Sequence, residues 1–325
     1  MNPRGPFSFL TAAVLLVSVA LGAGAYAQTY PVKPIRIVNP SAPGGSNDVV
    51  ARLLVKTMTA ELGQSVYVDN RPGAGGNIGT ELVAKAPADG YTLLIVLGSF
   101  AINPSLMKQV PYDPIKDFEC ISKLSSYTYF LTAHPSTPAR SIQQLIALAK
   151  AKPDQLTYGT SGIGGTAHLA GALLNHMAGI RLVHVAYKGG APAMVALLGG
   201  EVALSFNGTS VFPQLQTKKL IALGVTGLKR MTAAPDVPTI AESGIPGYEV
   251  IGWNALFAPA GTPAPIIDEL SKLTRRWLTN PDTKTTFEAQ GLEPEPGTPQ
   301  DLGEMVKSEL VKWAKVIKTA GIKPE

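Results

Sequence analysis

Cysteine is nearly absent from this sequence. Among 325 residues there is one, Cys120, so no disulfide bond can form within the chain. Charged residues are also few, at 16%, and the net charge is +5. The basic residues are not clustered with aromatic residues, as they typically are in nucleic-acid-binding proteins. The 45% of hydrophobic residues excludes a disordered chain, so stability has to come from a packed core.

The sequence also lacks the motifs of common cofactor-dependent enzymes, including a Walker phosphate-binding loop. Residues 162–167 match the G-x-G-x-x-A spacing of dinucleotide-binding turns, but the next strand ends at Tyr187 and Lys188 without the acidic residue that binds a ribose hydroxyl. The histidines lack metal-ligand spacing, and we interpret them as packed or surface side chains: His134, His168, His176 and His184. We therefore expect no metal, no cofactor and no catalytic residue.

The first 27 residues have the pattern of a cleavable secretory signal. Arg4 precedes an apolar run from Phe9 to Leu21, and small residues surround a cleavage point near Ala27. The run is about 13 residues long, shorter than the roughly 20 that a membrane-spanning helix needs, so a retained anchor is the less favoured interpretation. The mature protein is expected to work outside the cytoplasm, where nucleotide cofactors are not supplied.

From Pro34 onward, short β-branched runs alternate with Gly-rich or Ser-rich turns and with segments of helical spacing. This alternation predicts an α/β protein built from parallel βαβ units. The expected elements of the first part are strands at 35–38, 66–68 and 92–97, a helix ending at Gly63 and a helix over 77–85. Farther along, Ser141 and Gln144 form a capping box, and helices over 265–278 and 302–320 are expected to pack on the first domain.

Two extended segments divide the chain into two domains. Residues 127–133 and 248–258 have the character of crossovers between domains. We predict a first lobe from residues 28–127 plus 250–325 and a second lobe from residues 128–249. Each lobe would contain a doubly wound, mostly parallel sheet, and a central ligand cleft would lie between the lobes at the carboxyl ends of the strands.

Two glycine-rich turns, Pro43–Asp48 and Thr160–Thr166, each connect a strand to the start of a helix, one in each predicted lobe. Glycines let backbone N–H groups point outward, and the unpaired amides of a first helical turn attract anions together with the helix dipole. A dicarboxylate held by both turns would favour closed lobes. The candidate ligand-binding residues lie in these turns and at neighbouring strand ends: Ser41, Gly44, Gly45, Ser46, Asn47, Asp48, Ser99, Thr160, Ser161, Gly164, Gly165, Thr166 and Asn207.

Simpler roles for some of these residues stay open at this point. Ser46, Asn47 or Asp48 could cap its own helix, with the glycines merely turning the chain. Trp253, on the second crossover, fits cleft lining and hinge packing equally well.

The sequence resembles the extracytoplasmic solute receptors of tripartite tricarboxylate transporters, often called the Bug family. The resemblance covers essentially the whole mature chain and is carried by the segments at 30–36, 43–48, 70–79, 89–93, 187–189, 235–239 and 258–263. It implies a periplasmic, type II-like binding protein whose two lobes close on a small carboxylate. The turns at 41–48 and 160–166 correspond to those expected to hold that carboxylate.

Two positions depart from the pattern of the family. Phe is common where Ser41 stands, so the cleft would be wider or more polar there. Asp is common where Asn207 stands, a position suited to an ammonium group. The neutral Asn207 favours organic acids without an amino group, aliphatic or aromatic, although it also suits a turn before Gly208.

The resemblance further implies delivery of the small carboxylate to the membrane permease subunits of a tripartite tricarboxylate transporter. A receptor that presents its closed lobes to a membrane sensor kinase fits the sequence as well. An exported hydrolase that uses Ser99 or Ser161 is a third and less favoured alternative, because the sequence places no base beside either serine.

Overall fold

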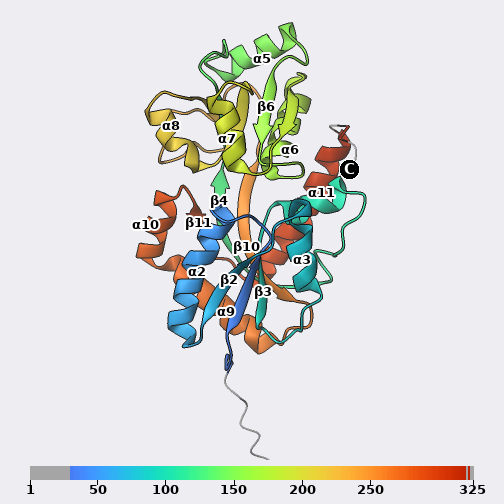
Figure 1. Cartoon of the computed structure of the whole chain (residues 1–325), viewed down its shortest axis with the longest axis vertical. Helices are drawn as coiled ribbons and strands as arrows, with labels where there is room; N and C mark the ends of the chain where they lie inside the picture. The colour runs from blue at the N-terminus through green and yellow to red at the C-terminus, as the bar shows by residue number, and fades with distance from the viewer. Residues whose placement is uncertain (1–29, 320, 323–325) are drawn as a thin grey trace, which may run out of the picture. The chain divides into compact units, whose positions relative to one another are not determined.

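The computed structural model describes residues 30–319 and 321–322, so the predicted signal peptide, residues 1–27, lies outside the described residues. From Lys33 onward the described chain forms one compact unit that contains two sheets, and we call the part around each sheet a lobe (Figure 1). No helix in the described part of the chain is both long and apolar enough to cross a membrane.

Lobe 1 is built on a six-stranded sheet with the order β11-β4-β10-β3-β1-β2. β1 pairs in parallel with β2 and β3, whereas β10 runs antiparallel to β3 and β4. The elements of this lobe are β1 (Ile35–Asn39), α2 (Ser46–Leu62), β2 (Val66–Asn70), η1 (Ala74–Gly76), α3 (Asn77–Ala84), β3 (Thr92–Leu97), α4 (Ser99–Leu106), β4 (Phe118–Thr128), β10 (Ile251–Pro259), α9 (Ala264–Thr279), α10 (Pro281–Ala289), β11 (Glu293–Pro294) and α11 (Pro299–Thr319).

Lobe 2 is built on a five-stranded sheet with the order β7-β6-β8-β5-β9. β6 is parallel to β7 and β8, and β5 is antiparallel to β8 and β9. Its elements are β5 (Phe130–Ala133), α5 (Ile142–Ala151), β6 (Thr157–Thr160), α6 (Thr166–Ala178), β7 (Val183–Ala186), α7 (Gly190–Leu198), β8 (Leu204–Asn207), η2 (Thr209–Val211), α8 (Phe212–Gln216) and β9 (Ile221–Val225).

The predicted α/β architecture with two lobes is confirmed, but the sheets are mixed and not mostly parallel as predicted, because antiparallel pairs occur in both. Parallel pairing is found in the βαβ units, as expected. The antiparallel pairs come from the crossovers, because β4 leaves lobe 1 and β10 returns to it beside β4 in the opposite direction. At this crossing Tyr127 lies opposite Gly252, where a Cβ atom would lie 2.8 Å from the tyrosine hydroxyl. A larger residue at position 252 would therefore displace Tyr127.

Several local predictions are confirmed. The strand over 92–97 is β3, and Gly63 ends α2 in the left-handed conformation, with a φ of 64°. Ser141 caps α5, since its hydroxyl accepts a hydrogen bond from the Gln144 amide at 3.2 Å. Gln144 does not complete the box with Ser141, because its side chain accepts instead from the amide of Arg140.

The C-terminal helix α11 belongs to both lobes. Leu302 and Val306 pack in the core of lobe 1, as expected for this helix. Farther along the same helix, Trp313 and Ile317 are buried in the core of lobe 2. The expectation that this helix packs on the first domain was therefore incomplete, because its two ends meet different cores.

Candidate ligand-binding site

The helix α2 begins without a side-chain cap. Its N-cap residue is Gly45, with an extended conformation at φ −79° and ψ 169°, and no side chain there accepts a hydrogen bond from the first turn. The amides of Ser46, Asn47 and Asp48 have no acceptor among the described residues. These N–H groups and the positive end of the helix dipole together suit an anion.

The Asp48 side chain holds the turn before α2. Its carboxylate accepts hydrogen bonds from the Gly44 amide at 3.0 Å, from Arg52 Nε at 2.9 Å and from Asn70 Nδ2 at 3.0 Å. Burial pushes the pKa of Asp48 upward, but the hydrogen bonds from Arg52, Gly44 and Asn70 outweigh it and lower the pKa below its ordinary value. The carboxylate is thus ionised and paired, and the Gly44 amide is engaged within the turn.

Asn47 is likewise engaged within lobe 1. It is fully buried, and its Nδ2 donates to Asn39 Oδ1 at 2.8 Å and to the carbonyl of Ile95 at 3.0 Å. Its Oδ1 accepts from Asn254 Nδ2 at 2.6 Å. The side chain of Asn47 therefore fixes α2 onto the sheet, and what it offers to a ligand is its backbone amide.

The helix α6 in lobe 2 begins in the same manner as α2. Its N-cap residue is Gly165, with φ −74° and ψ 156°, and again no side chain caps the first turn. The amides of Thr166 and Ala167 have no acceptor within the described part of the chain. Just before them, the Gly164 amide donates to His168 Nδ1 at 3.4 Å.

Two stacked imidazoles lie beneath this second turn. The rings of His168 and His184 have centroids 4.0 Å apart, and Thr160 Oγ1 lies 2.6 Å from His184 Nε2. Burial lowers the pKa of His168 to about 4, and burial together with the charge of His168 lowers the pKa of His184 to about 3. Both rings are therefore neutral at neutral pH, and the attraction for an anion comes from the backbone of α6.

Two tyrosine hydroxyl groups lie between the two helix starts. The Tyr127 hydroxyl lies near the side chain of Ser46, the first residue of α2. It accepts a hydrogen bond from Tyr129 at 3.3 Å, and the Tyr129 hydroxyl lies near the side chain of Thr166, the first residue of α6. The two glycine-rich turns that the sequence predicts as one site therefore lie on either side of two tyrosines, at the passage from β4 to β5.

The start of α4 meets the same place. A Cβ atom on Gly98 would lie 3.0 Å from Thr166 Oγ1 and 3.4 Å from Trp253 Nε1. Ser99, the first residue of α4, is half-buried at this point. Trp253 itself is 2% exposed in the lobe 1 core, and its indole N–H donates to Glu309 of α11 at 3.2 Å, so it packs behind the site.

The remaining predicted residues have different surroundings. Thr160 is 1% exposed and belongs to the histidine cluster, whereas Ser161 is exposed. Ser41 is half-buried, and its amide donates to Asn39 Oδ1 at 3.1 Å. Asn207 is nearly buried at the end of β8, where its Nδ2 donates to Thr132 Oγ1 at 2.7 Å.

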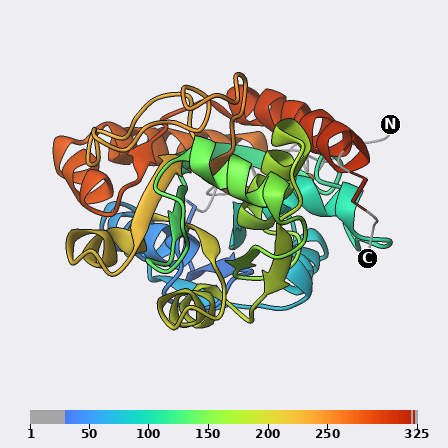
Figure 2. The ribbon, with the colours of Figure 1, turned by 90° about the horizontal axis from the view of Figure 1, so that it is seen from above.

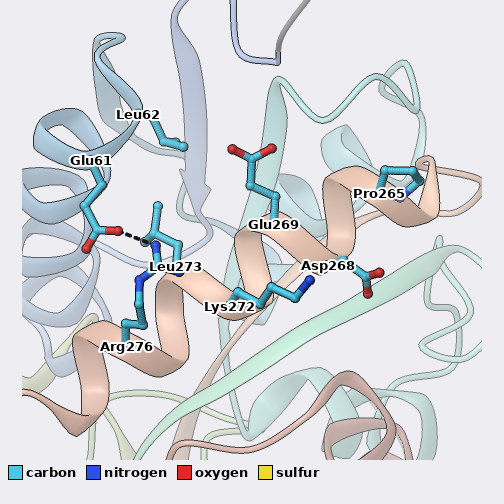
Figure 3. Close-up of a pocket in the computed structure, with 8 residues that line it drawn as sticks. All are labelled: Glu61, Leu62, Pro265, Asp268, Glu269, Lys272, Leu273 and Arg276. Atoms are coloured by element: carbon cyan, nitrogen blue, oxygen red, sulfur yellow. Dashed lines mark hydrogen bonds and ion pairs between the residues drawn. The ribbon is translucent and has the colours of Figure 1, made fainter.

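A hollow of about 460 Å³ lies between the lobes beside the second turn. Lobe 2 contributes Ser161–Ile163, and lobe 1 contributes residues of η1, Asn77 at the start of α3, and Leu106 and Met107 at the end of α4. Another hollow, of about 490 Å³, lies between the end of α2 and α9 (Figure 3). There the carboxylate of Glu61 and the guanidinium of Arg276 form an ion pair at 2.6 Å. Acidic and basic side chains both line this hollow, and it does not include the residues at the starts of α2 and α6. The described residues contain no group of three side chains that could hold a metal ion.

Sequence reasoning missed the two tyrosines and the pairing of the histidines. Tyr127 and Tyr129 belong to a predicted crossover strand. They are two residues apart, so both side chains are expected on the same face of that strand, and this spacing could have indicated their pairing. His168 and His184 were correctly expected to be packed, but nothing in their spacing of 16 residues indicates a stacked pair beneath a binding turn.

Comparison with known proteins identifies the family of this chain. The sequence model of the tripartite tricarboxylate transporter family receptor matches residues 50–322. The chain belongs to this receptor family. Its members are periplasmic solute-binding proteins and not enzymes, and the resemblance drawn from the sequence motifs is confirmed.

Three solved structures of solute-binding proteins are similar to this family member. Rpa4515 from R. palustris, solved with adipate, is 36% identical, with a TM-score of 0.86 over 91% of this chain and 100% of that one. The periplasmic binding protein BugD is 38% identical, with a TM-score of 0.83 over 91% and 100%. MatC from Rhodopseudomonas palustris, solved with bound malate, is 31% identical, with a TM-score of 0.81 over 89% and 100%.

Proposed function

We propose that this receptor captures a small organic carboxylate between its lobes and delivers it to the membrane permease of a tripartite tricarboxylate transporter. The ligand is a mono- or dicarboxylate, aliphatic or aromatic. The predicted lobes, residues 28–127 plus 250–325 and residues 128–249, close on it. Ligand-binding groups come from the turns at 41–48 and 160–166.

The observation that carries this proposal is the pair of uncapped helix starts. Amides without an acceptor among the described residues begin both helices, at Ser46–Asp48 and at Thr166–Ala167, and Tyr127 and Tyr129 lie between Ser46 and Thr166. A carboxylate between them accepts hydrogen bonds from both lobes, and only closed lobes offer both sets of donors. The nearby charged side chains, Asp48 and Arg52, are already paired with each other.

The chemistry of the neighbouring side chains supports an acid without an amino group. Asn207 is neutral and donates to Thr132, whose hydroxyl in turn donates to the Ser205 carbonyl. An ammonium group would need an anionic partner, and the carboxylate of Asp48 is engaged by Arg52. The adipate and malate in the related structures are acids of this kind.

Calorimetry and thermal unfolding with a panel of mono- and dicarboxylates test this function. A bound acid at 100 times its Kd should stabilise the folded protein by about 2.7 kcal/mol. The matching amides and alcohols are the controls, since they lack the negative charge. A folded protein that no acid of the panel stabilises would contradict the proposal.

Gly45→Val and Gly165→Val test the two turns. Both glycines have negative φ, and the nearest atoms to an added Cβ lie 3.9 Å away, so the fold tolerates the change. The valine side chain shields the free amides, and we expect affinity to fall at least about tenfold. Gly164 is less suitable for substitution. Its φ of 80° would strain the backbone of any other residue, and an added Cβ would contact Leu106 of lobe 1 and so hinder closing of the lobes. Unchanged affinity in both valine variants would show that the turns do not hold the ligand.

Delivery to a permease is tested separately from binding. The acid-loaded protein is incubated with solubilised membranes of its source organism, and the captured proteins are identified by mass spectrometry. Recovery of permease subunits supports transport. Recovery of a sensor kinase without permease subunits would favour the alternative, a receptor for signalling.

A further inference from the structure

The two sides of the junction between the lobes are built differently. On one side the apolar residues Ile102 and Leu106 of α4 and Trp313 and Ile317 of α11 are part of the lobe 2 core. On the opposite side α10 of lobe 1 lies near α8 of lobe 2, and both views separate this side from α11 (Figures 1 and 2). The first side is a continuous buried core, and the second is a surface contact.

The surface contact has a close fit at three residues, which we call the η2–α10 contact: Thr209, Gln290 and Gly291. Thr209 Oγ1 donates a hydrogen bond to the carbonyl of Gln290. Gly291 is buried with a φ of 65°, and a Cβ atom on it would lie 2.5 Å from Thr209 Cβ and 2.8 Å from Thr209 Oγ1. Because Thr209 Cβ is itself too near, no rotamer of Thr209 makes room for a side chain at 291.

The two sides differ in the cost of separating them. Moving α11 out of lobe 2 would expose the indole of Trp313 and the side chain of Ile317, which are both buried and apolar, so the loss of hydrophobic stabilisation is large. The η2–α10 contact has one hydrogen bond from a half-buried threonine, and water can replace such a bond at little net cost. Opening of the lobes therefore separates the η2–α10 side and pivots on the α4–α11 side.

We propose that the η2–α10 contact is the closing contact of this receptor, and that Thr209 and Gly291 set ligand affinity without touching the ligand. This inference rests on the proposed function, since it assumes lobes that close on a solute. The physical basis is that apparent affinity is proportional to the fraction of molecules able to close. A residue that prevents η2 from reaching Gly291 reduces this fraction and leaves every group at the ligand turns in place.

Gly291→Ala is the decisive variant, and the chain offers a matched control. Gly63 has nearly the same φ, 64°, but no atom within 4 Å of an added Cβ, so Gly63→Ala has the same backbone strain without a contact between lobes. We expect Gly291→Ala to weaken acid binding about tenfold relative to Gly63→Ala.

Thr209→Gly combined with Gly291→Ala removes the collision and should recover part of the affinity. Thr209→Val keeps the shape but not the donor, and should weaken binding about threefold.

Small-angle X-ray scattering with and without acid gives a readout that does not depend on affinity. Gly291→Ala should have a larger radius of gyration than the wild type and Gly63→Ala. If no acid binds to the wild type but Gly291→Ala is still expanded, the proposed function fails and the closing contact stands. Equal scattering of Gly291→Ala and Gly63→Ala in all conditions, with equal affinity for any acid that binds, would overturn the closing contact.

Discussion

The helices α5 and α10 begin with a side-chain cap, whereas α2 and α6 begin after a glycine without one, as α3, α4 and α7 also do. At α5 and α10 a side chain closes the first turn: Ser141 accepts from Gln144, and Asn280 accepts from the Asp282 amide at 2.8 Å. At α2 and α6 a glycine occupies the same position, and the first amides have no acceptor in the part of the chain that the structure describes.

This difference follows from what the first turn is used for. A side-chain cap stabilises a helix by about 0.5–2 kcal/mol relative to alanine, because it satisfies amides that would otherwise lack a partner. The same amides can satisfy a ligand only if no cap competes for them. Gly45 and Gly165 thus leave amide donors at both helix starts available to a ligand, near the hydrogen-bonded pair Tyr127 and Tyr129.

The largest effect is expected when a binding helix is given a cap of its own. In Gly165→Asp the new carboxylate caps α6 and takes the place of the ligand, so acid binding should weaken more than about a hundredfold through like-charge repulsion. Thermal unfolding should occur at an equal or higher temperature, because the first turn is now satisfied. Gly165→Asn is the neutral counterpart and should weaken binding less. Tight acid binding by Gly165→Asp, measured by calorimetry, would refute the assignment of α6.

The next effect is a pH dependence of the free energy of unfolding, which we expect from the histidine pair near the start of α6. Unfolded histidine takes up a proton below its pKa of about 6.5, whereas burial keeps folded His168 neutral down to about 4 and His184 down to about 3. The unfolded state therefore binds more protons in this window, and the free energy of unfolding should fall as the pH drops from 6.5 to 4.

Urea unfolding at a series of pH values measures this fall. The double variant His168→Gln with His184→Gln removes both titrating groups and should give a flatter profile between pH 6.5 and 4. A wild-type profile that is level over this range, or as steep as that of the double variant, would contradict the buried neutral pair. The cap of α5 is formed by a hydroxyl and provides no such pH dependence.

A smaller effect is expected from the hydroxyl chain between the two binding starts. Tyr129→Phe removes the hydrogen bond to Tyr127 and the hydroxyl group near Thr166, and the affinity for acid should fall between about twofold and tenfold. Tyr248→Phe is the matched control, because its hydroxyl donates to the Ala170 carbonyl at 2.8 Å inside lobe 2. The control should lower stability without changing affinity. If both variants bind acid equally well, the tyrosines do not organise the site.

The smallest effect on binding is expected at a capped helix. Ser141→Ala should lower the free energy of unfolding by about 1 kcal/mol, because the Gln144 amide loses its acceptor. Its affinity for acid should equal that of the wild type in the same calorimetric titration. A loss of affinity here would mean that the contrast between capped and uncapped helix starts has no bearing on function.

Local chemistry made much of the fold predictable. Gly63 ends α2, Ser141 caps α5 and the strand at 92–97 has the predicted bounds, because each depends on neighbours within a few residues. The helix α10 was not predicted. Its nine residues are mostly polar and bury only Phe287, so its apolar periodicity is too weak to detect.

The sequence by itself determined most of the elements, the crossovers and the two glycine-rich turns, since these features follow from local propensity and hydrophobic spacing. Tertiary structure alone decided which groups meet: Tyr127 and Tyr129 between the turns, the stacked histidines, and Gly291 against Thr209. These partners are distant in the sequence or come from different lobes. Their contacts depend on how two sheets are oriented through β4, β10 and α11, and no local pattern of residues encodes that orientation.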